Sequence, residues 1–188
     1  FNAQAETDIE KATIWRIYTL CWAAKRALRL DGDFMECGSH RGTSARIVAE
    51  YLDFASVPKR FLMFDIFDNE GQSSHHGYPD LEGGIYEFVK DRFAPFPNVD
   101  VIKGWVPGIL DGNTPEKLAF LHIDMNNVTA EMAALERLFD LVVPGGSVVL
   151  DDYGWTAYRA QKESEDAFFQ ARGYQVLELP TGQGLVIK

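Results

Sequence analysis

The chain has 188 residues, of which 46% are hydrophobic and 13% aromatic, and it carries a formal net charge of −10. A chain of this length can bury a sizeable core, so we expect one globular domain over residues 1–188, with residues 1–30 as an N-terminal helical segment. The acidic charge argues against nucleic acid or an anionic membrane as the main partner. The chain starts at Phe1 rather than Met, so we expect it to be trimmed from something longer.

The sequence has no apolar run of about 18 residues and no signal-peptide pattern. Cys21 and Cys37 are the only cysteines, and their spacing is not that of a metal site. Reduced thiols of this kind are typical of the cytoplasm, which is where we expect the protein to act.

Hydrophobic periodicity predicts helices and strands that alternate along the chain. The predicted helices are residues 8–28, 43–54, 81–93, 129–141 and 157–172. The predicted strands are residues 33–37, 60–65, 99–103, 119–124 and 147–150, with a turn at 144–146 and a closing hairpin of 174–179 and 184–187. This alternation predicts an α/β fold, a doubly wound and mostly parallel seven-stranded sheet with a C-terminal antiparallel hairpin.

Two of the predicted strands run into aspartates. Asp124 ends one strand, and Asp151 and Asp152 follow another. In an open α/β sheet, ligands bind just beyond the carboxyl ends of the strands. Three carboxylates gathered there repel one another unless a cation joins them, and oxygen ligands suit Mg²⁺, Mn²⁺ or Ca²⁺ better than zinc. We therefore predict a divalent metal site on these residues, although Asp152 alone equally fits a turn or a helix cap.

A glycine-rich segment, residues 36–44, lies between the first strand and the next helix. Glycine lets the backbone come close to a ligand, and the helix N-terminus offers free N–H groups. The segment lacks the third glycine of a dinucleotide fingerprint and the Gly-Lys of a phosphate loop. This motif alone fits both a turn that binds a ligand and a tight turn with a purely structural role.

Acidic residues near that segment indicate which ligand it would take. Asp65 ends the second strand, where it can accept the hydroxyls of a ribose, and Glu36 can meet a positively charged group. Two acids disfavour a diphosphate and favour a cationic nucleoside such as S-adenosylmethionine. Trp105 either lies against the adenine or is ordinary core. The predicted cofactor-binding residues are Glu36, Cys37, Gly38, Ser44, Asp65 and Trp105.

An ordered set of short motifs resembles the class I S-adenosylmethionine-dependent methyltransferases and, more narrowly, is similar to the macrocin-type O-methyltransferases. The motifs are residues 32–38, 64–65, 103–105, 122–124, 144–146 and 151–154. The resemblance implies a Rossmann-like methyltransferase fold and transfer of a methyl group to a sugar or natural-product hydroxyl. It also implies a Mg²⁺ (or Mn²⁺) ion on Asp124, Asp151 and Asp152.

The acceptor of that reaction would be a small molecule, and its contacts are expected in residues 68–80, in residues 153–158 and in the N-terminal helix. The aromatic N-terminal helix fits either a homo-oligomer face or ordinary core, and the sequence leaves both open.

One departure from the family pattern concerns the base. The pattern usually carries a second acid two residues after the first metal aspartate, and this chain has Asn126 there. An amide is no base at neutral pH. Proton removal then falls to Asp124, His122, one of the loop residues His75 and His76, or a metal that acidifies the hydroxyl. His122 also fits a packed core residue.

Two other functions are compatible with parts of the sequence. Asn126 is the one hint of a catalytically inactive domain that only binds a ligand or serves as a scaffold. A nicotinamide-dependent oxidoreductase is disfavoured by the missing third glycine. Tyr158 and Lys162 are interpreted as a coincidence on a helix surface.

Overall fold

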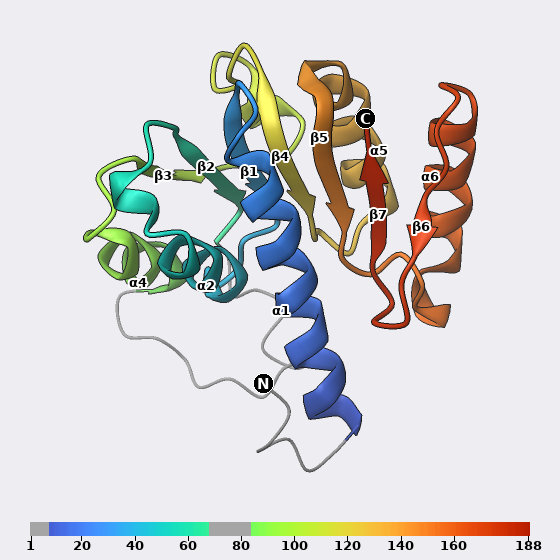
Figure 1. Ribbon diagram of the computed structural model, residues 1–188, viewed down its shortest axis with the longest axis horizontal. Coiled ribbons are helices and arrows are strands. Elements are labelled where there is room, and N and C mark those ends of the chain that lie inside the picture. The colour runs from blue at the N-terminus through green and yellow to red at the C-terminus, as the bar shows by residue number, and fades with distance from the viewer. Residues whose placement is uncertain (1–7, 68–83) are drawn as a thin grey trace.

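The structure of the protein, a computed structural model, describes residues 8–67 and 84–188, and its side chains from residue 13 onward (Figure 1). The expected acceptor loop, with His75 and His76, lies outside the described residues. Within the described part of the chain, no helix is long and apolar enough to cross a membrane.

Helices and strands alternate as the sequence predicts. The helices are α1 (Asp8–Ala27), α2 (Thr43–Tyr51), α4 (Gly84–Phe93), α5 (Val128–Leu138) and α6 (Arg159–Gln170). The strands are β1 (Asp33–Cys37), β2 (Phe61–Asp65), β3 (Val99–Lys103), β4 (Leu118–Ile123), β5 (Val142–Leu150), β6 (Leu177–Glu178) and β7 (Gly184–Ile187). Two predicted helices end about three residues early. A 3₁₀ helix, Phe139–Leu141, replaces the last turn of α5, and α2 stops before Asp53, which has a left-handed φ of 49°.

The strands form one seven-stranded sheet in the order β3-β2-β1-β4-β5-β7-β6. Strands β1 to β5 pair in parallel, whereas β7 runs antiparallel to both β5 and β6. The predicted doubly wound sheet with its C-terminal antiparallel hairpin is therefore confirmed.

The predicted turn at 144–146 is not a break between elements, because these residues lie within β5. The pairing of β4 with β5 jumps from Leu118 opposite Val142 to Phe120 opposite Ser147, so the intervening residues bulge out. Their backbone groups pair with the end of the chain instead. The Gly145 N–H donates to the Lys188 carbonyl at 2.6 Å, and the Lys188 N–H donates to Gly146 at 3.0 Å.

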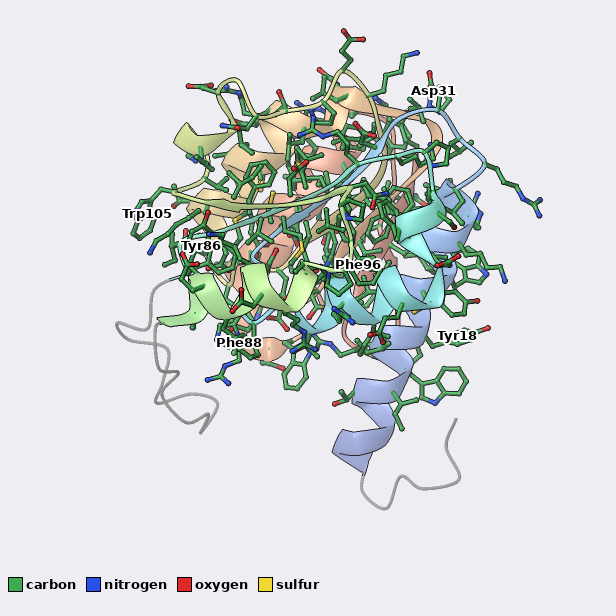
Figure 2. The ribbon with its side chains drawn as sticks, turned by 90° about the vertical axis from the view of Figure 1, so that its left-hand side faces the viewer. Tyr18, Asp31, Tyr86, Phe88, Phe96 and Trp105 are labelled. Carbon is green, nitrogen blue, oxygen red and sulfur yellow. The ribbon has the colours of Figure 1, made fainter. Side chains whose placement is uncertain are left out.

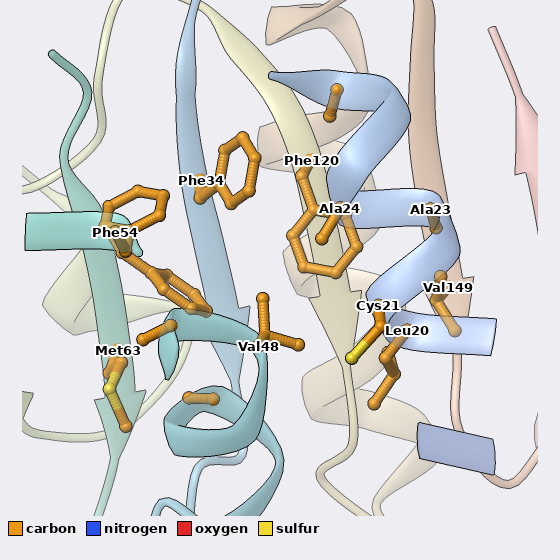
Figure 3. Packing of buried hydrophobic residues seen from close by; sticks show 14 of the residues in the cluster. Leu20, Cys21, Ala23, Ala24, Phe34, Val48, Phe54, Met63, Phe120 and Val149 are labelled. Carbon is orange, nitrogen blue, oxygen red and sulfur yellow. The ribbon is translucent and has the colours of Figure 1, made fainter. Parts of the chain in front are cut away.

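Two layers of helices bury the two faces of the sheet. Helices α1, α2 and α4 pack on one face, and α5 and α6 on the other. Figure 3 shows Phe120 and Val149 of the sheet next to the small residues Ala24 and Ala23 of α1. The small alanines let this helix approach the strands closely.

Strand β1 leads into a turn that only glycine fits. Gly38 has a φ of 94°, and a Cβ atom added to it would lie 1.9 Å from the Asp124 carbonyl oxygen. The neighbouring bond, from the Asp124 N–H to the Cys37 carbonyl at 2.8 Å, holds these two backbones together. The glycine thus lets the ends of β1 and β4 meet.

We expect Gly38→Ala to lower the free energy of unfolding by about 2 kcal/mol or more, because both the left-handed backbone and the clash oppose the methyl group. Gly173→Ala is the matched control, since Gly173 has a φ of 80° and no other atom within 4 Å of the added Cβ. It should cost about 1 kcal/mol through backbone strain alone. Denaturant unfolding measures both variants, and equal losses would contradict the close approach.

Candidate functional site

Strand register gathers the polar side chains at the carboxyl ends of β1, β4 and β5. Glu36 of β1 pairs with His122 of β4, and His122 pairs with Val149 of β5. Val149 packs beneath α1, so the alternation of a strand carries Asp151, two residues later, to the same face. The three polar side chains therefore lie side by side under α1.

His122 links two carboxylates in the interior. Its Nδ1 lies 2.8 Å from Oε1 of Glu36, and its Nε2 lies 3.5 Å from Oδ1 of Asp151. Burial alone would lower the pKa of His122, but the carboxylates of Asp151 and Glu36 outweigh it and raise the pKa to about 10. The ring is then protonated at neutral pH, which suits a charged link between the two acids better than a base.

Of the acids in this group, Asp151 has the most hydrogen-bond donors and positive charges next to its carboxylate. Its Oδ1 accepts a hydrogen bond from Nε2 of the buried Gln183 at 2.8 Å, and its Oδ2 accepts one from the Arg16 guanidinium. Burial would raise the pKa of Asp151, but His122 and Arg16 hold it well below its usual range. Arg16 also donates to Oδ1 of Asp152 at 3.0 Å.

The Asp124 carboxylate has the fewest partners that would offset its negative charge. Within the described residues, no hydrogen-bond donor reaches its carboxylate, and burial together with the nearby Asp151 raises its pKa well above the usual value. One nitrogen of His122 and one carboxylate oxygen each of Asp124 and Asp151 lie within 4.8 Å of one another, and with the His122 ring protonated the two carboxylates are the ones that can bind a cation. A partly buried carboxylate with no donor, beside a second one, is a donor set that fits a hard divalent cation. Asp152 lies outside this trio and is paired with Arg16.

A pocket opens next to these acids, over the glycine-rich turn. Its lining residues are Glu36, Gly38, Ser39, His40, Arg41, Thr43, Ser44 and Asp124. Oε2 of Glu36 is buried and has no hydrogen-bond partner among the described residues. The pocket is therefore lined by a carboxylate, one of whose oxygens has no hydrogen-bond donor among the described residues. Three of the predicted cofactor residues, Glu36, Gly38 and Ser44, meet here.

The other predicted cofactor residues lie elsewhere. The Cys37 thiol packs in the core against the α5 and α6 side of the sheet. The Asp65 carboxylate accepts the backbone N–H groups of His40 and Phe67, each at 2.7 Å, and so ties the glycine turn to the end of β2. Trp105 is 74% exposed at the margin of the molecule, so it is not a core residue (Figure 2).

Asn126 lies in the turn after β4, with a left-handed φ of 53° and an exposed side chain. The N–H groups of Met125 and Asn126 donate to Oε1 of Glu131 at 2.9 and 3.0 Å. Glu131 faces Glu165 of α6, and both are buried. Burial raises the pKa of Glu131 to about 7 and that of Glu165 to about 9, so this pair holds a proton at neutral pH.

The residues that the sequence did not indicate are Arg16, Glu131, Glu165 and Gln183. One of them left a readable signal. Glu165 stands on the buried face of α6, in line with Gln161, Phe168 and Phe169, where a surface helix would carry only apolar side chains. A buried carboxyl group in such a position indicates a hydrogen-bonding partner that is also buried.

We expect the stability of the protein to fall as the pH rises through the pKa of Glu165. The folded state holds a proton on this group that the unfolded state releases near pH 4.5, so raising the pH toward about 9 favours unfolding. Glu165→Gln keeps the shape without an ionisable proton, so its melting temperature should decline less between pH 6 and pH 9. Glu163→Gln, on the exposed side of the same helix, should decline as the parent does. Parallel curves for the parent and Glu165→Gln would contradict the buried acid pair.

Comparison with known proteins identifies the family. The family model of macrocin-O-methyltransferases (TylF) matches residues 16–175. A curated relative from Streptomyces olivaceus, 8-demethyl-8-(2,3-dimethoxy-alpha-L-rhamnosyl)-tetracenomycin-C 4'-O-methyltransferase, is 27% identical over 144 residues. That match covers 68% of this chain and 55% of the relative, so the chain spans about half the relative's length.

Solved structures share the fold. The O-methyltransferase NovP superposes with a TM-score of 0.73 at 19% identity, over 93% of this chain and 80% of NovP. CalS11, described as a TDP-rhamnose 3'-O-methyltransferase of calicheamicin biosynthesis, gives 0.73 at 17% identity, over 93% and 79% of the two chains. Together with the extent of the family match, the order of the strands and the acidic strand ends, this places the chain in the macrocin-O-methyltransferase family.

Proposed function

We propose that this chain is an S-adenosylmethionine-dependent O-methyltransferase that requires a divalent metal ion and acts on a hydroxyl of a sugar or a related natural product. The names of the tetracenomycin relative and of CalS11 support a glycosidic acceptor. The observation that carries the proposal is the pocket beside Asp124, in which Glu36 presents a buried oxygen without a partner. We further propose that residues 8–67 and 84–188 act as one domain, because one sheet runs through them.

The charge of the pocket supports a cationic methyl donor. S-adenosylmethionine would supply a methyl group on a positively charged sulfur, and it also carries an ammonium group. Glu36 would accept a hydrogen bond from that ammonium through its open oxygen, and the N–H groups at the start of α2 lie around the same pocket. Asp65 would take the ribose through its remaining lone pairs, and the exposed ring of Trp105 would cover the adenine.

The acids at the ends of β4 and β5 support the metal. Asp124, Asp151 and Asp152 would hold the ion, which would supply positive charge and lower the pKa of the acceptor hydroxyl. His122 would keep Asp151 oriented, because its protonated ring pairs with Oδ1 of that residue. Removal of the hydroxyl proton would fall to Asp124, whose carboxylate has no competing donor among the described residues and a raised pKa. Asn126 would then orient the acceptor through its amide.

The inactive-domain alternative rests on Asn126 alone, and a turnover assay separates it from the enzyme. An oxidoreductase would have to place a diphosphate against Glu36 and Asp124, which like-charge repulsion opposes. Calorimetry with NAD⁺ beside S-adenosylmethionine tests that second alternative.

We expect Glu36→Gln to weaken S-adenosylmethionine binding by about 10- to 100-fold, because the ammonium loses a charge-assisted hydrogen bond. Isothermal titration calorimetry measures the affinity. Glu50→Gln, which removes an equal charge from the exposed side of α2, should bind as the parent does. Unchanged affinity in Glu36→Gln would remove the assignment of this pocket to the methyl donor.

We expect Asn126→Asp to raise the rate of methyl transfer by at least about tenfold near pH 6.5, because it adds a carboxylate base beside the acceptor. Aspartate tolerates the same left-handed backbone as asparagine, so the turn should persist. Rates are measured across pH with Mg²⁺ and with Mn²⁺, over a panel of sugar nucleotides and glycosylated natural products. A chelated sample is the control and should not turn over.

A lower rate in Asn126→Asp, with donor and metal still bound, would show that the site depends on the amide. Full activity after exhaustive chelation would exclude the metal. If neither the parent nor the variant transfers methyl to any acceptor, the inactive-domain alternative becomes the better one.

A further inference from the structure

Arg16 is the one α1 residue in the described part of the chain that hydrogen-bonds to the acidic site. Its guanidinium donates to Oδ2 of Asp151 and, at 3.0 Å, to Oδ1 of Asp152, and it lies 5.7 Å from the centre of the Trp155 ring. The side chain is 18% exposed. These contacts join residues more than 130 positions apart in the chain, so they report the docking of α1 rather than local structure.

The two halves of α1 are held to the sheet in different ways. The carboxyl-terminal half is anchored by fully buried side chains at helical spacing, Leu20, Ala23, Ala24 and Ala27. Between residues 13 and 19, no side chain is buried, and Trp15 and Tyr18 are nearly half exposed. Figure 1 shows this amino-terminal half extending past the carboxyl ends of β4 and β5. Ile17 packs partly buried against the core, and the Arg16 ion pairs add a polar link between this half and the end of β5.

The oxygens that Arg16 occupies are ones that a divalent ion would need. Oδ1 of Asp151 already accepts from Gln183 and faces His122, both fully buried, so Oδ2 is the oxygen of that residue that can change partner. Arg16 sits on this oxygen and on Asp152 at once. Because one oxygen cannot make a strong bond to a guanidinium and a close metal contact in the same direction, the two cations exclude each other there.

We propose that Arg16 is a built-in counter-cation that competes with the divalent ion for Asp151 and Asp152, so that binding of the ion releases the amino-terminal half of α1. Without the ion, Arg16 offsets the repulsion between these carboxylates and keeps α1 docked over them. With the ion bound, that neutralisation is redundant and the link is lost. Metal affinity and α1 docking are then coupled, and the coupling works equally in both directions. The inference rests on the proposed metal site.

The test measures Mn²⁺ binding to the full chain by the electron paramagnetic resonance signal of the free ion. Arg16→Gln should bind Mn²⁺ at least about tenfold more tightly than the parent, because the ion no longer displaces two charge-assisted hydrogen bonds. Arg29→Gln, which removes an exposed positive charge just beyond α1, is the matched control and should bind as the parent does.

Hydrogen exchange separates direct competition from a simple change in charge. Mn²⁺ should speed amide exchange in residues 8–19 of the parent, whereas in Arg16→Gln these amides should exchange fast without the ion. Asp152→Asn, which removes the negative charge from the 3.0 Å partner, should also speed their exchange in metal-free protein. Equal or weaker Mn²⁺ binding in Arg16→Gln, or tighter binding with no change in α1 exchange, would overturn the proposal. If no variant binds Mn²⁺, the metal site itself is wrong and the competition falls with it.

Discussion

Four carboxyl groups meet where β1, β4 and β5 end, and their mutual repulsion is the constraint on which the site depends. Glu36, Asp124, Asp151 and Asp152 come from strands that are hydrogen-bonded to one another or from the turns that follow them, so the sheet forces them together. The fold tolerates this because two cations are placed among them. A protonated His122 lies between Glu36 and Asp151, and the α1 guanidinium lies on the β5 side. The negative charge that these two cations do not offset lies mainly on Asp124 and on one oxygen of Glu36.

The residual negative charge lies at two places, and each of them suits a different ligand. Glu36 lines the glycine pocket, and its buried Oε2 has no partner among the described residues, so a ligand there would need hydrogen-bond donors. Asp124 lines the same pocket and also lies within ligand distance of Asp151. A cationic methyl donor and a divalent ion would therefore each neutralise one side of the same cluster. Because His122 bonds to Glu36 and faces Asp151, a change of charge at Glu36 alters the electrostatic environment of Asp151, and the reverse.

The strand ends could be predicted from the sequence because local signals define them. An apolar run that stops at an acid predicts the place of Asp65, Asp124 and Asp151, and parallel pairing brings such ends to one edge. The partners of these acids could not be predicted in the same way. Arg16 and Gln183 reach Asp151 from a helix far earlier in the chain and from the closing hairpin, and only tertiary packing determines those contacts. Residues 144–146 form a bulge in β5 rather than the predicted turn, because their hydrogen-bond partner, Lys188, is also remote in the sequence.

Buried acids are ionised on one face of the sheet and protonated on the other. The difference follows from whether cationic side chains lie next to them. On the α1 face, Asp151 has Arg16, His122 and Gln183 as partners, so burial does not prevent its ionisation. Between α5 and α6, Glu131 and Glu165 have no cation among their described contacts, and a proton takes that role. The protonated pair still has a structural role, since Glu131 accepts hydrogen bonds from the backbone of the Asn126 turn. On the α1 face, cationic partners thus keep Asp151 ionised, whereas on the other face a protonated acid pair supplies the fixed acceptor that the turn needs.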